Sequence, residues 1–138
     1  YNEISDKEID NLILDLNNNK GDAIKRFIYK CCKGSVTEKR DFKNLLDFKT
    51  KYSNIDKEIL IKSLREVKKL RVLLNKKNSI GIDTLVIQGE HDSFFPPNRN
   101  EEQKSCNIKY RIVKGMSHYP FLSFNNEIKR EIIKFVEA

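Results

Sequence analysis

Apolar residues in the first half of the chain recur every three to four positions, which is the spacing of amphipathic helices. Two of these stretches open with Ser-x-x-Glu, at Ser5 and at Ser35. In this pattern, called a capping box, the serine hydroxyl and the glutamate carboxylate each accept a hydrogen bond from a free backbone N–H at the start of the helix. The sequence therefore predicts four short helices, over residues 5–17, 22–34, 35–48 and 56–67. In the last of them Ile59, Leu60 and Leu64 are expected to face inward. The apolar stripes are narrow, so these helices should form a thin layer that rests on another part of the protein.

The second half of the chain changes to strand-like patterns. Residues 84–87 form a continuous apolar run, which predicts a strand buried on both faces. Residues 108–114 alternate between apolar and polar and predict a second strand, and residues 125–137 predict an amphipathic helix. The inward residues of this helix should be Ile128, Ile132, Phe135 and Val136. The interval between the strands has room for a loop and a short helix, so the two strands should be parallel.

These elements predict an α/β fold in which flanking helices cover parallel strands near 84–88 and 108–114. The predicted division gives a helical part over residues 1–77 and a strand-helix-strand-helix part over residues 78–138. Two parallel strands are too few for a stable sheet, so the first strand should have further neighbours. We therefore expect the chain to be the end of a larger sheet and a piece of a longer protein.

The composition favours a folded, soluble protein. Apolar residues make up 38% of the chain and charged residues 34%. No stretch approaches the roughly 20 apolar residues that a membrane-spanning helix needs, and the N-terminal residues lack the pattern of a signal peptide. A cytoplasmic location is expected. The three cysteines suit neither a disulfide framework nor a zinc site and are expected to be reduced. The adjacent Cys31 and Cys32 are expected to be core thiols.

Positive charge is concentrated in one segment. The net charge of the chain is +7, and residues 20–51 hold ten Lys or Arg against four acids, a net +6. Such a segment can be a solvated helical face, or it can attract an acidic partner.

Two short motifs follow the two predicted strands. Gly89-Glu90-His91-Asp92 comes after the first strand, and Gly115-Met116-Ser117-His118 comes after the second. Side chains at the carboxyl ends of parallel strands share one crevice, so Asp92 and His118 should meet there. A carboxylate that orients a histidine is the Asp–His half of a hydrolytic triad.

Each of these motif residues also has a plainer interpretation. Asp92 could be a turn aspartate before a proline-containing loop, and His118 could be a packing or capping residue. His91 is expected either to face solvent or to contact the residues of the site without taking part in the reaction. A metal site at His91 and Asp92 is not expected, because no third ligand lies nearby in the sequence. No cofactor is expected either.

The pattern of strand, Gly-x-x-Asp, a gap of some 26 residues, Gly-x-x-His and a final helix resembles the α/β-hydrolase family over residues 80–138. In that family the acid follows the seventh strand and the histidine the eighth. The resemblance implies that Asp92 orients His118 and that His118 acts as the general base toward a serine. Residues 1 to about 75 then occupy the place of the helical lid that many of these enzymes carry.

The lid segment is similar to that of the pimeloyl-acyl carrier protein methyl ester esterases of biotin synthesis, a family within the α/β-hydrolases. The similarity lies in DLNNNKGDAIKRFIYKCCKGS, in LIKSLREVKKLRVLL and in HYPFLS. It implies an acyl carrier protein as partner and a carboxylesterase activity. By matching positions, Phe27 would face the acyl chain. The residues that would contact the carrier protein are Arg26, Lys39, Arg40 and Lys43.

Phe94, Phe95 and Phe121 flank the two motifs. They could wall a hydrophobic acyl pocket, or they could be ordinary core.

The chain departs from the family in one respect that matters for chemistry. The Gly-x-Ser-x-Gly motif that presents the nucleophile is absent from all 138 residues, and so are the first strands and the oxyanion-hole loop. Ser117, beside the histidine, is expected to be a loop hydroxyl. The nucleophile must then come from another part of the protein or from a second chain. The alternative is a non-catalytic binding module whose basic helices hold an acidic protein or a nucleic acid.

Overall fold

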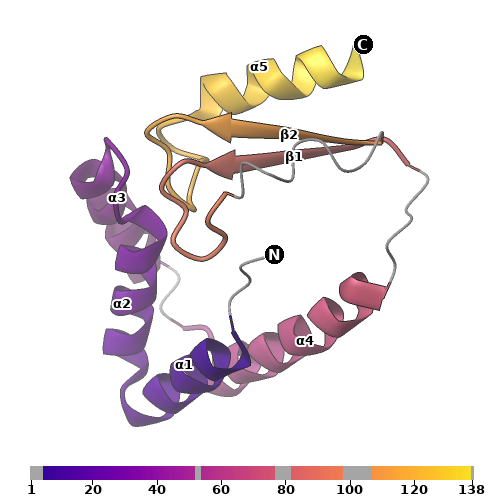
Figure 1. The fold of residues 1–138 in the computed structure, drawn as a ribbon. Coiled ribbons are helices and arrows are strands. Elements are labelled where there is room, and N and C mark those ends of the chain that lie inside the picture. The colour runs from indigo at the N-terminus through magenta and orange to yellow at the C-terminus, as the bar shows by residue number, and fades with distance from the viewer. Residues whose placement is uncertain (1–4, 52–53, 77–81, 98–106, 138) are drawn as a thin grey trace.

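The computed structural model describes residues 5–51, 54–76, 82–97 and 107–137. The elements, in chain order, are α1 Asp6–Asn18, α2 Lys20–Cys32, α3 Glu38–Lys51, α4 Lys57–Lys76, β1 Thr84–Gly89, β2 Ile108–Val113 and α5 Asn125–Val136 (Figure 1). Helices with a pair of parallel strands place the described part of the chain in the α/β class. Residues 90–97 and 107, in the interval between the strands, form no helix, and the rest of the interval in which a short helix was expected lies outside the described residues.

The first capping box forms as predicted. The Ser5 hydroxyl accepts a hydrogen bond from the Glu8 backbone N–H at 3.2 Å, and the Glu8 carboxylate accepts one from the Ser5 N–H at 2.9 Å. A small apolar core then joins α1, α2 and α4 through Leu16, Ala23 and Ile61, which are at most 3% exposed. Burial of these side chains is the main force that holds the three helices together.

The second capping box was predicted wrongly. The Glu38 carboxylate accepts from the Gly34 N–H at 2.8 Å, and the Ser35 hydroxyl accepts from the Thr37 N–H at 3.2 Å. Gly34 adopts φ +84, which turns the chain sharply after α2 and brings its N–H to the glutamate. The helix α3 therefore begins at Glu38, three residues after the predicted serine.

Two predictions for α4 are also corrected. The helix does not end near residue 67 but continues to Lys76, because no glycine or proline interrupts it there. Ile59, predicted to face inward, is 59% exposed, whereas Ile61 is 3% exposed. Two residues are about 200° apart around a helix, so the two isoleucines lie on nearly opposite faces and only one can join the core.

The strands β1 and β2 pair in parallel, from Thr84 opposite Ile108 to Gly89 opposite Val113. The prediction that β1 is buried on both faces was wrong for the structure described, because residues 84–88 are only half-buried. Among the described residues β2 is the one strand that pairs with β1. A strand with this apolar sequence would reach full burial with a second neighbour.

The last helix, α5, lies along the strands on the side away from α1 and α4 (Figure 1). Ile128 and Phe135 are half-buried, as expected for inward residues. Ile132 and Val136 were predicted to face inward as well, but they are 47% and 76% exposed. The two-stranded sheet is too narrow to cover the whole apolar face of the helix. None of the helices within the described residues is long and apolar enough to cross a membrane.

Candidate active site

The loops that follow β1 and β2 lie beside α2 and α3. Both strand arrows point toward these helices in Figure 1, and the in-register pairing ends at Gly89 and Val113. Because parallel strands finish at the same edge of a sheet, the two loops begin next to one another. The structure thus gathers the end of the sheet and the helical layer around one place.

Asp92 and His118 are in direct contact at this edge. The Nδ1 atom of His118 lies 2.9 Å from Oδ2 of Asp92. The Asp92 side chain is 7% exposed and that of His118 is 32% exposed, so the carboxylate is enclosed while the imidazole reaches the surface. The two residues lie together as the sequence predicts; that they are catalytic stays a prediction.

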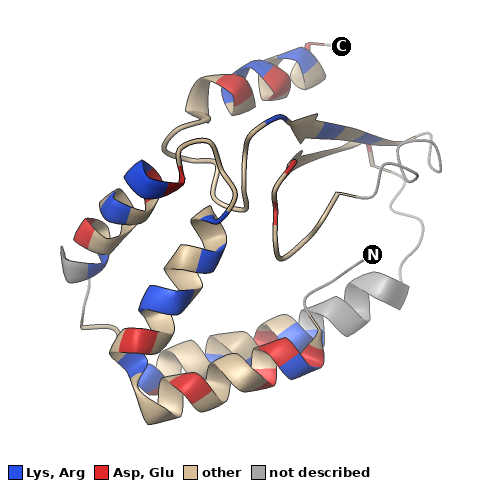
Figure 2. Ribbon diagram, turned by 60° about the vertical axis from the view of Figure 1, so that its left-hand side comes forward, with Lys and Arg blue, Asp and Glu red and all other residues tan. Residues whose placement is uncertain are grey.

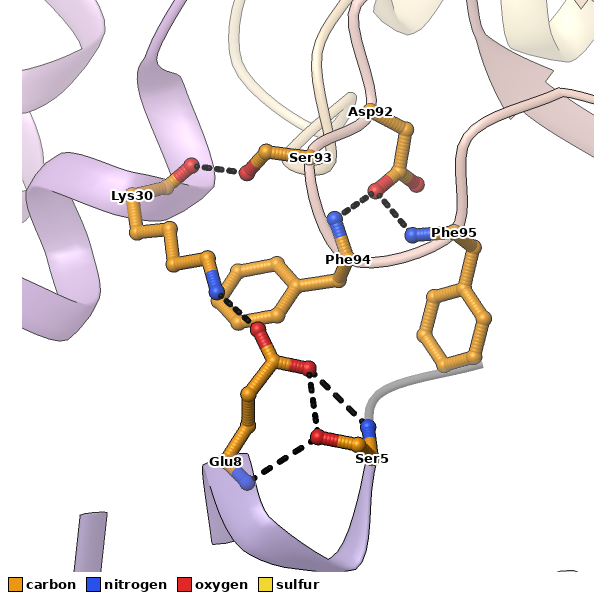
Figure 3. A network of polar contacts seen from close by, with 7 residues as sticks. All are labelled: Ser5, Glu8, Lys30, Asp92, Ser93, Phe94 and Phe95. Carbon is orange, nitrogen blue, oxygen red and sulfur yellow. Dashed lines mark hydrogen bonds and ion pairs between the residues drawn. The ribbon is translucent and has the colours of Figure 1, made fainter. Parts of the chain in front are cut away.

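The two oxygens of Asp92 have different partners. Oδ1 accepts hydrogen bonds of 2.8 Å from the backbone N–H groups of Phe94 and Phe95, which makes a local turn (Figure 3). Oδ2 is left to face His118. The turn interpretation and the orienting interpretation therefore both apply, each to one oxygen. The turn fixes the carboxylate rotamer and so aims the second oxygen at the imidazole.

The loops cross at a point where only glycine fits. A Cβ atom added to Gly89 would lie 2.3 Å from the Ser117 carbonyl oxygen and 2.4 Å from that of Met116. Backbone bonds join the loops on either side of this contact: the His91 N–H donates to the Met116 carbonyl at 2.9 Å, and the Glu90 N–H donates to the Val113 carbonyl at 3.0 Å. The distance between the two motifs is thereby fixed by main-chain contacts.

Aromatic rings extend from the imidazole toward α2. The ring of Phe94 lies 4.8 Å from that of His118, and the ring of Phe27 lies 5.4 Å from Phe94. Phe95 stacks on His118 with the ring centres 5.7 Å apart. Of the residues predicted to line an acyl pocket, Phe27 and Phe94 thus lie together beside the histidine. Phe121 is 68% exposed, and its ring contacts that of Tyr119 instead.

The contact with Asp92 selects one form of the neutral imidazole. A carboxylate accepts hydrogen bonds, so the proton of neutral His118 belongs on Nδ1, where it donates to Oδ2. The lone pair then resides on Nε2, which can take a proton from a hydroxyl. This is the arrangement that general-base catalysis requires.

Ser117, Cys31 and Cys32 are not placed as nucleophiles. Ser117 is 2% exposed and donates to the Cys31 carbonyl at 2.8 Å, which agrees with its predicted role as a loop hydroxyl. Burial raises the pKa of Cys31 to about 12 and that of Cys32 to about 11. At neutral pH both thiols remain protonated, and protonated thiols are poor nucleophiles. They are free buried cysteines; Cys106 lies outside the described residues.

The basic residues of the helical layer differ in how far they are engaged. Arg26 forms an ion pair of 3.0 Å with Asp15, and Arg40 donates to the Ser123 hydroxyl at 2.8 Å. Lys39 and Lys43 are exposed and make no hydrogen bond or ion pair with the described residues. Basic residues recur along both α2 and α3 (Figure 2). Of the four basic residues that the sequence singles out, these two lysines therefore keep their charge unpaired within the described residues.

Two structural features were missed from the sequence. Asp41 is 1% exposed and accepts hydrogen bonds from Thr37, at 2.6 Å, and from Ser123. It ties α3 to the segment that follows His118. The ammonium of Lys30 lies 4.6 Å from the centre of the Phe94 ring. In the sequence, Asp41 and Lys30 look like any other solvent-exposed charged residues, and neither belongs to a recognised motif.

His91 is exposed, and its Nε2 lies 3.6 Å from the Glu90 carboxylate. Within the part of the chain that the structure describes, no group of three His, Cys, Asp or Glu residues could hold a metal ion.

No protein-family model, curated protein or solved structure matches the chain. The functional interpretation therefore depends on the two motifs, their spacing and the geometry of the residues that they bring together.

Proposed function

We propose that this chain supplies the acid and the base of a serine carboxylic ester hydrolase of the α/β-hydrolase type. The observation that carries the proposal is the 2.9 Å contact between His118 Nδ1 and Asp92 Oδ2 at the ends of two neighbouring parallel strands. The enclosed carboxylate and the surface-reaching imidazole have the burial that these two roles need.

In the proposed reaction, Nε2 of His118 takes the proton of a serine hydroxyl as the serine oxygen attacks the ester carbonyl. Asp92 stabilises the resulting imidazolium. The imidazolium then gives its proton to the departing alcohol oxygen, which leaves an acyl-serine. Water, deprotonated by the same nitrogen, attacks the acyl group, and the proton returns to the serine when the acid is released.

The serine lies outside these 138 residues, because no Gly-x-Ser-x-Gly motif occurs in them. We call residues 1–138 together with the segment that carries this serine the assembled hydrolase. The half-buried apolar strand β1 supports such an assembly, since a further strand would complete its burial.

The substrate that best fits the surroundings is the methyl ester of an acyl chain held on an acyl carrier protein, as in the esterases of biotin synthesis. Phe27, 38% exposed, packs on the buried ring of Phe94 beside His118, and its exposed side would suit an acyl chain. Lys39 and Lys43 offer exposed positive charge to an acidic carrier. A cytoplasmic location fits such a partner.

The assembled hydrolase should release methanol from an acyl-carrier-protein methyl ester and should also hydrolyse p-nitrophenyl butyrate. Chromatography of the acyl products and absorbance of p-nitrophenol would measure these two reactions. If neither ester is cleaved while the assembled protein is folded by circular dichroism, the proposed function is wrong. In that case, retained binding of an acidic protein or a nucleic acid would support the basic binding module instead.

Charge reversal on α3 should separate docking from chemistry. We expect the double variant Lys39→Glu and Lys43→Glu to lower kcat/KM for the carrier-protein ester by about tenfold or more at low salt, since charge pairs at an interface steer association. Hydrolysis of p-nitrophenyl butyrate should change less than twofold. The double variant Lys7→Glu and Lys129→Glu, an equal charge change at exposed lysines of α1 and α5, is the matched control. Equal losses on both substrates would contradict a docking role for these lysines.

A further inference from the structure

The C-terminal turn of α2 contacts both loops of the candidate site through consecutive carbonyl groups. The Lys30 carbonyl accepts a hydrogen bond of 3.0 Å from the Ser93 hydroxyl, and the Cys31 carbonyl accepts one of 2.8 Å from the Ser117 hydroxyl. The last four carbonyls of a helix lack partners within it. Two of those four in α2 are therefore satisfied by hydroxyl groups from the loops after β1 and β2.

The two serines are immediate neighbours of the acid and the base. Ser93 follows Asp92 directly, and Ser117 directly precedes His118. Successive carbonyls in an α-helix are held in a fixed relation by the helix geometry. A single rigid turn thus holds the backbone beside the acid and the backbone beside the base at the same time.

We propose that this turn is a positioning element for the Asp92–His118 contact. We name its four groups, the carbonyls of Lys30 and Cys31 and the hydroxyls of Ser93 and Ser117, the α2 anchor. Ser93 and Ser117 are then positioning residues: they touch neither substrate nor reacting atoms, and they act through the residues next to them. The inference rests on the proposed function. It adds that α2 controls the geometry of His118, the general base of the proposed reaction.

The end of α2 is itself held from a third side. The Lys30 ammonium donates to the Glu8 carboxylate at 2.8 Å, and this hydrogen bond lowers the pKa of Glu8 below its ordinary value. Glu8 also belongs to the capping box of α1, so the chain of contacts runs from Ser5 through Lys30 to Ser93 (Figure 3). Through the Lys30 side chain, the end of α2 that carries the α2 anchor is therefore also connected to α1.

The Ser93 bond is not needed to satisfy a buried group. Ser93 is exposed, so water could take the place of this bond at its hydroxyl. The bond is therefore better explained by the position that it gives to Ser93 than by a need to provide a buried polar atom with a hydrogen-bond partner. Ser117, by contrast, is buried, and its removal also leaves the Cys31 carbonyl without that donor.

The test uses nitrogen-15 NMR of the His118 imidazole in the 138-residue chain, with Asp92→Ala marking the state in which the contact is lost. We expect Ser93→Ala and Ser117→Ala each to lower the ratio of the Nδ1–H to the Nε2–H tautomer by about threefold, the effect of losing one hydrogen bond. Ser93→Thr, which keeps the hydroxyl, should restore the wild-type ratio.

The matched control is Ser63→Ala. Ser63 also donates its hydroxyl to a helix carbonyl, that of Ile59 at 2.9 Å, but it does so in α4. This variant should leave the tautomer ratio unchanged. Circular dichroism would identify variants that fail to fold, and the exposed Ser93 keeps the test valid if Ser117→Ala does so. A wild-type ratio in folded Ser93→Ala would overturn the positioning role.

Activity of the assembled hydrolase separates this inference from the proposed function. In Ser93→Ala, kcat for p-nitrophenyl butyrate should fall about threefold with KM unchanged, in parallel with the tautomer ratio. If Asp92→Ala abolishes hydrolysis while Ser93→Ala and Ser117→Ala change neither kcat nor the ratio, the function stands and the α2 anchor is wrong. If the ratio shifts but Asp92→Ala hydrolyses normally, the geometric role stands and the function is wrong.

Discussion

Replacing His118 by alanine should lower kcat for p-nitrophenyl butyrate in the assembled hydrolase by about 10⁴-fold or more, because the serine would lose its general base. Asp92→Asn should cause a loss of about 10⁴-fold. An amide can present its N–H₂ group to Nδ1 and so favour the wrong tautomer of the imidazole. Initial rates of p-nitrophenol release, with KM determined in parallel, would measure both effects.

His91→Ala is the matched control for this pair of variants. His91 lies one residue before Asp92, but its side chain is exposed and its Nε2 lies 3.6 Å from the Glu90 carboxylate. Its kcat should stay within about twofold of wild type. Wild-type rates in Asp92→Asn or in His118→Ala would contradict the assignment of acid and base.

Gly89→Ala should have the largest effect on stability. The added Cβ would meet the backbone of Met116 and Ser117 at 2.3–2.7 Å, and these atoms cannot move aside without shifting the loop that carries His118. We expect the free energy of unfolding to fall by about 3 kcal/mol, the upper part of the range for overpacking. Urea denaturation followed by circular dichroism would measure the loss.

Gly21→Ala controls for the loss of a glycine. In α2 the nearest atom to an added Cβ is Oδ1 of the Asn19 side chain, at 3.3 Å; this oxygen caps the Asp22 N–H, but it needs to shift by only a few tenths of an ångström. This variant should change the free energy of unfolding by less than about 1 kcal/mol, because the higher helix propensity of alanine and the pressure on the Asn19 cap oppose one another. A Gly89→Ala protein as stable as wild type would show that the two loops do not cross as closely as described.

The meeting of Asp92 and His118 could be predicted from sequence because it depends on few assumptions. An apolar run marks a strand, parallel strands end at one edge, and the motif after each strand must lie there. The position of α2 could not be predicted in this way. The contacts of Ser93 and Ser117 with the carbonyls of α2 depend on how the helical layer packs against the loops. A serine in a loop does not by itself predict such a contact.

The errors in the helices have a common physical origin. Periodicity identifies an apolar stripe but not which side of it meets a neighbour, so Ile59 was assigned to the core in place of Ile61. The sequence pattern likewise could not predict that the charged side chain of Asp41 is buried. Its carboxylate is enclosed because Thr37 and Ser123 both donate to it, and that pairing joins segments far apart in the sequence.

The most direct measurement of the central claim is labelling of the assembled hydrolase with a fluorophosphonate, followed by mass spectrometry of the modified peptide. Such a reagent reacts with a serine that a histidine has activated. We predict one labelled serine, outside residues 1–138, and a labelling rate that falls about a hundredfold or more in His118→Ala. A label on a serine within residues 1–138, or an equal rate in that variant, would contradict the claim that Asp92 and His118 serve a nucleophile from beyond this chain.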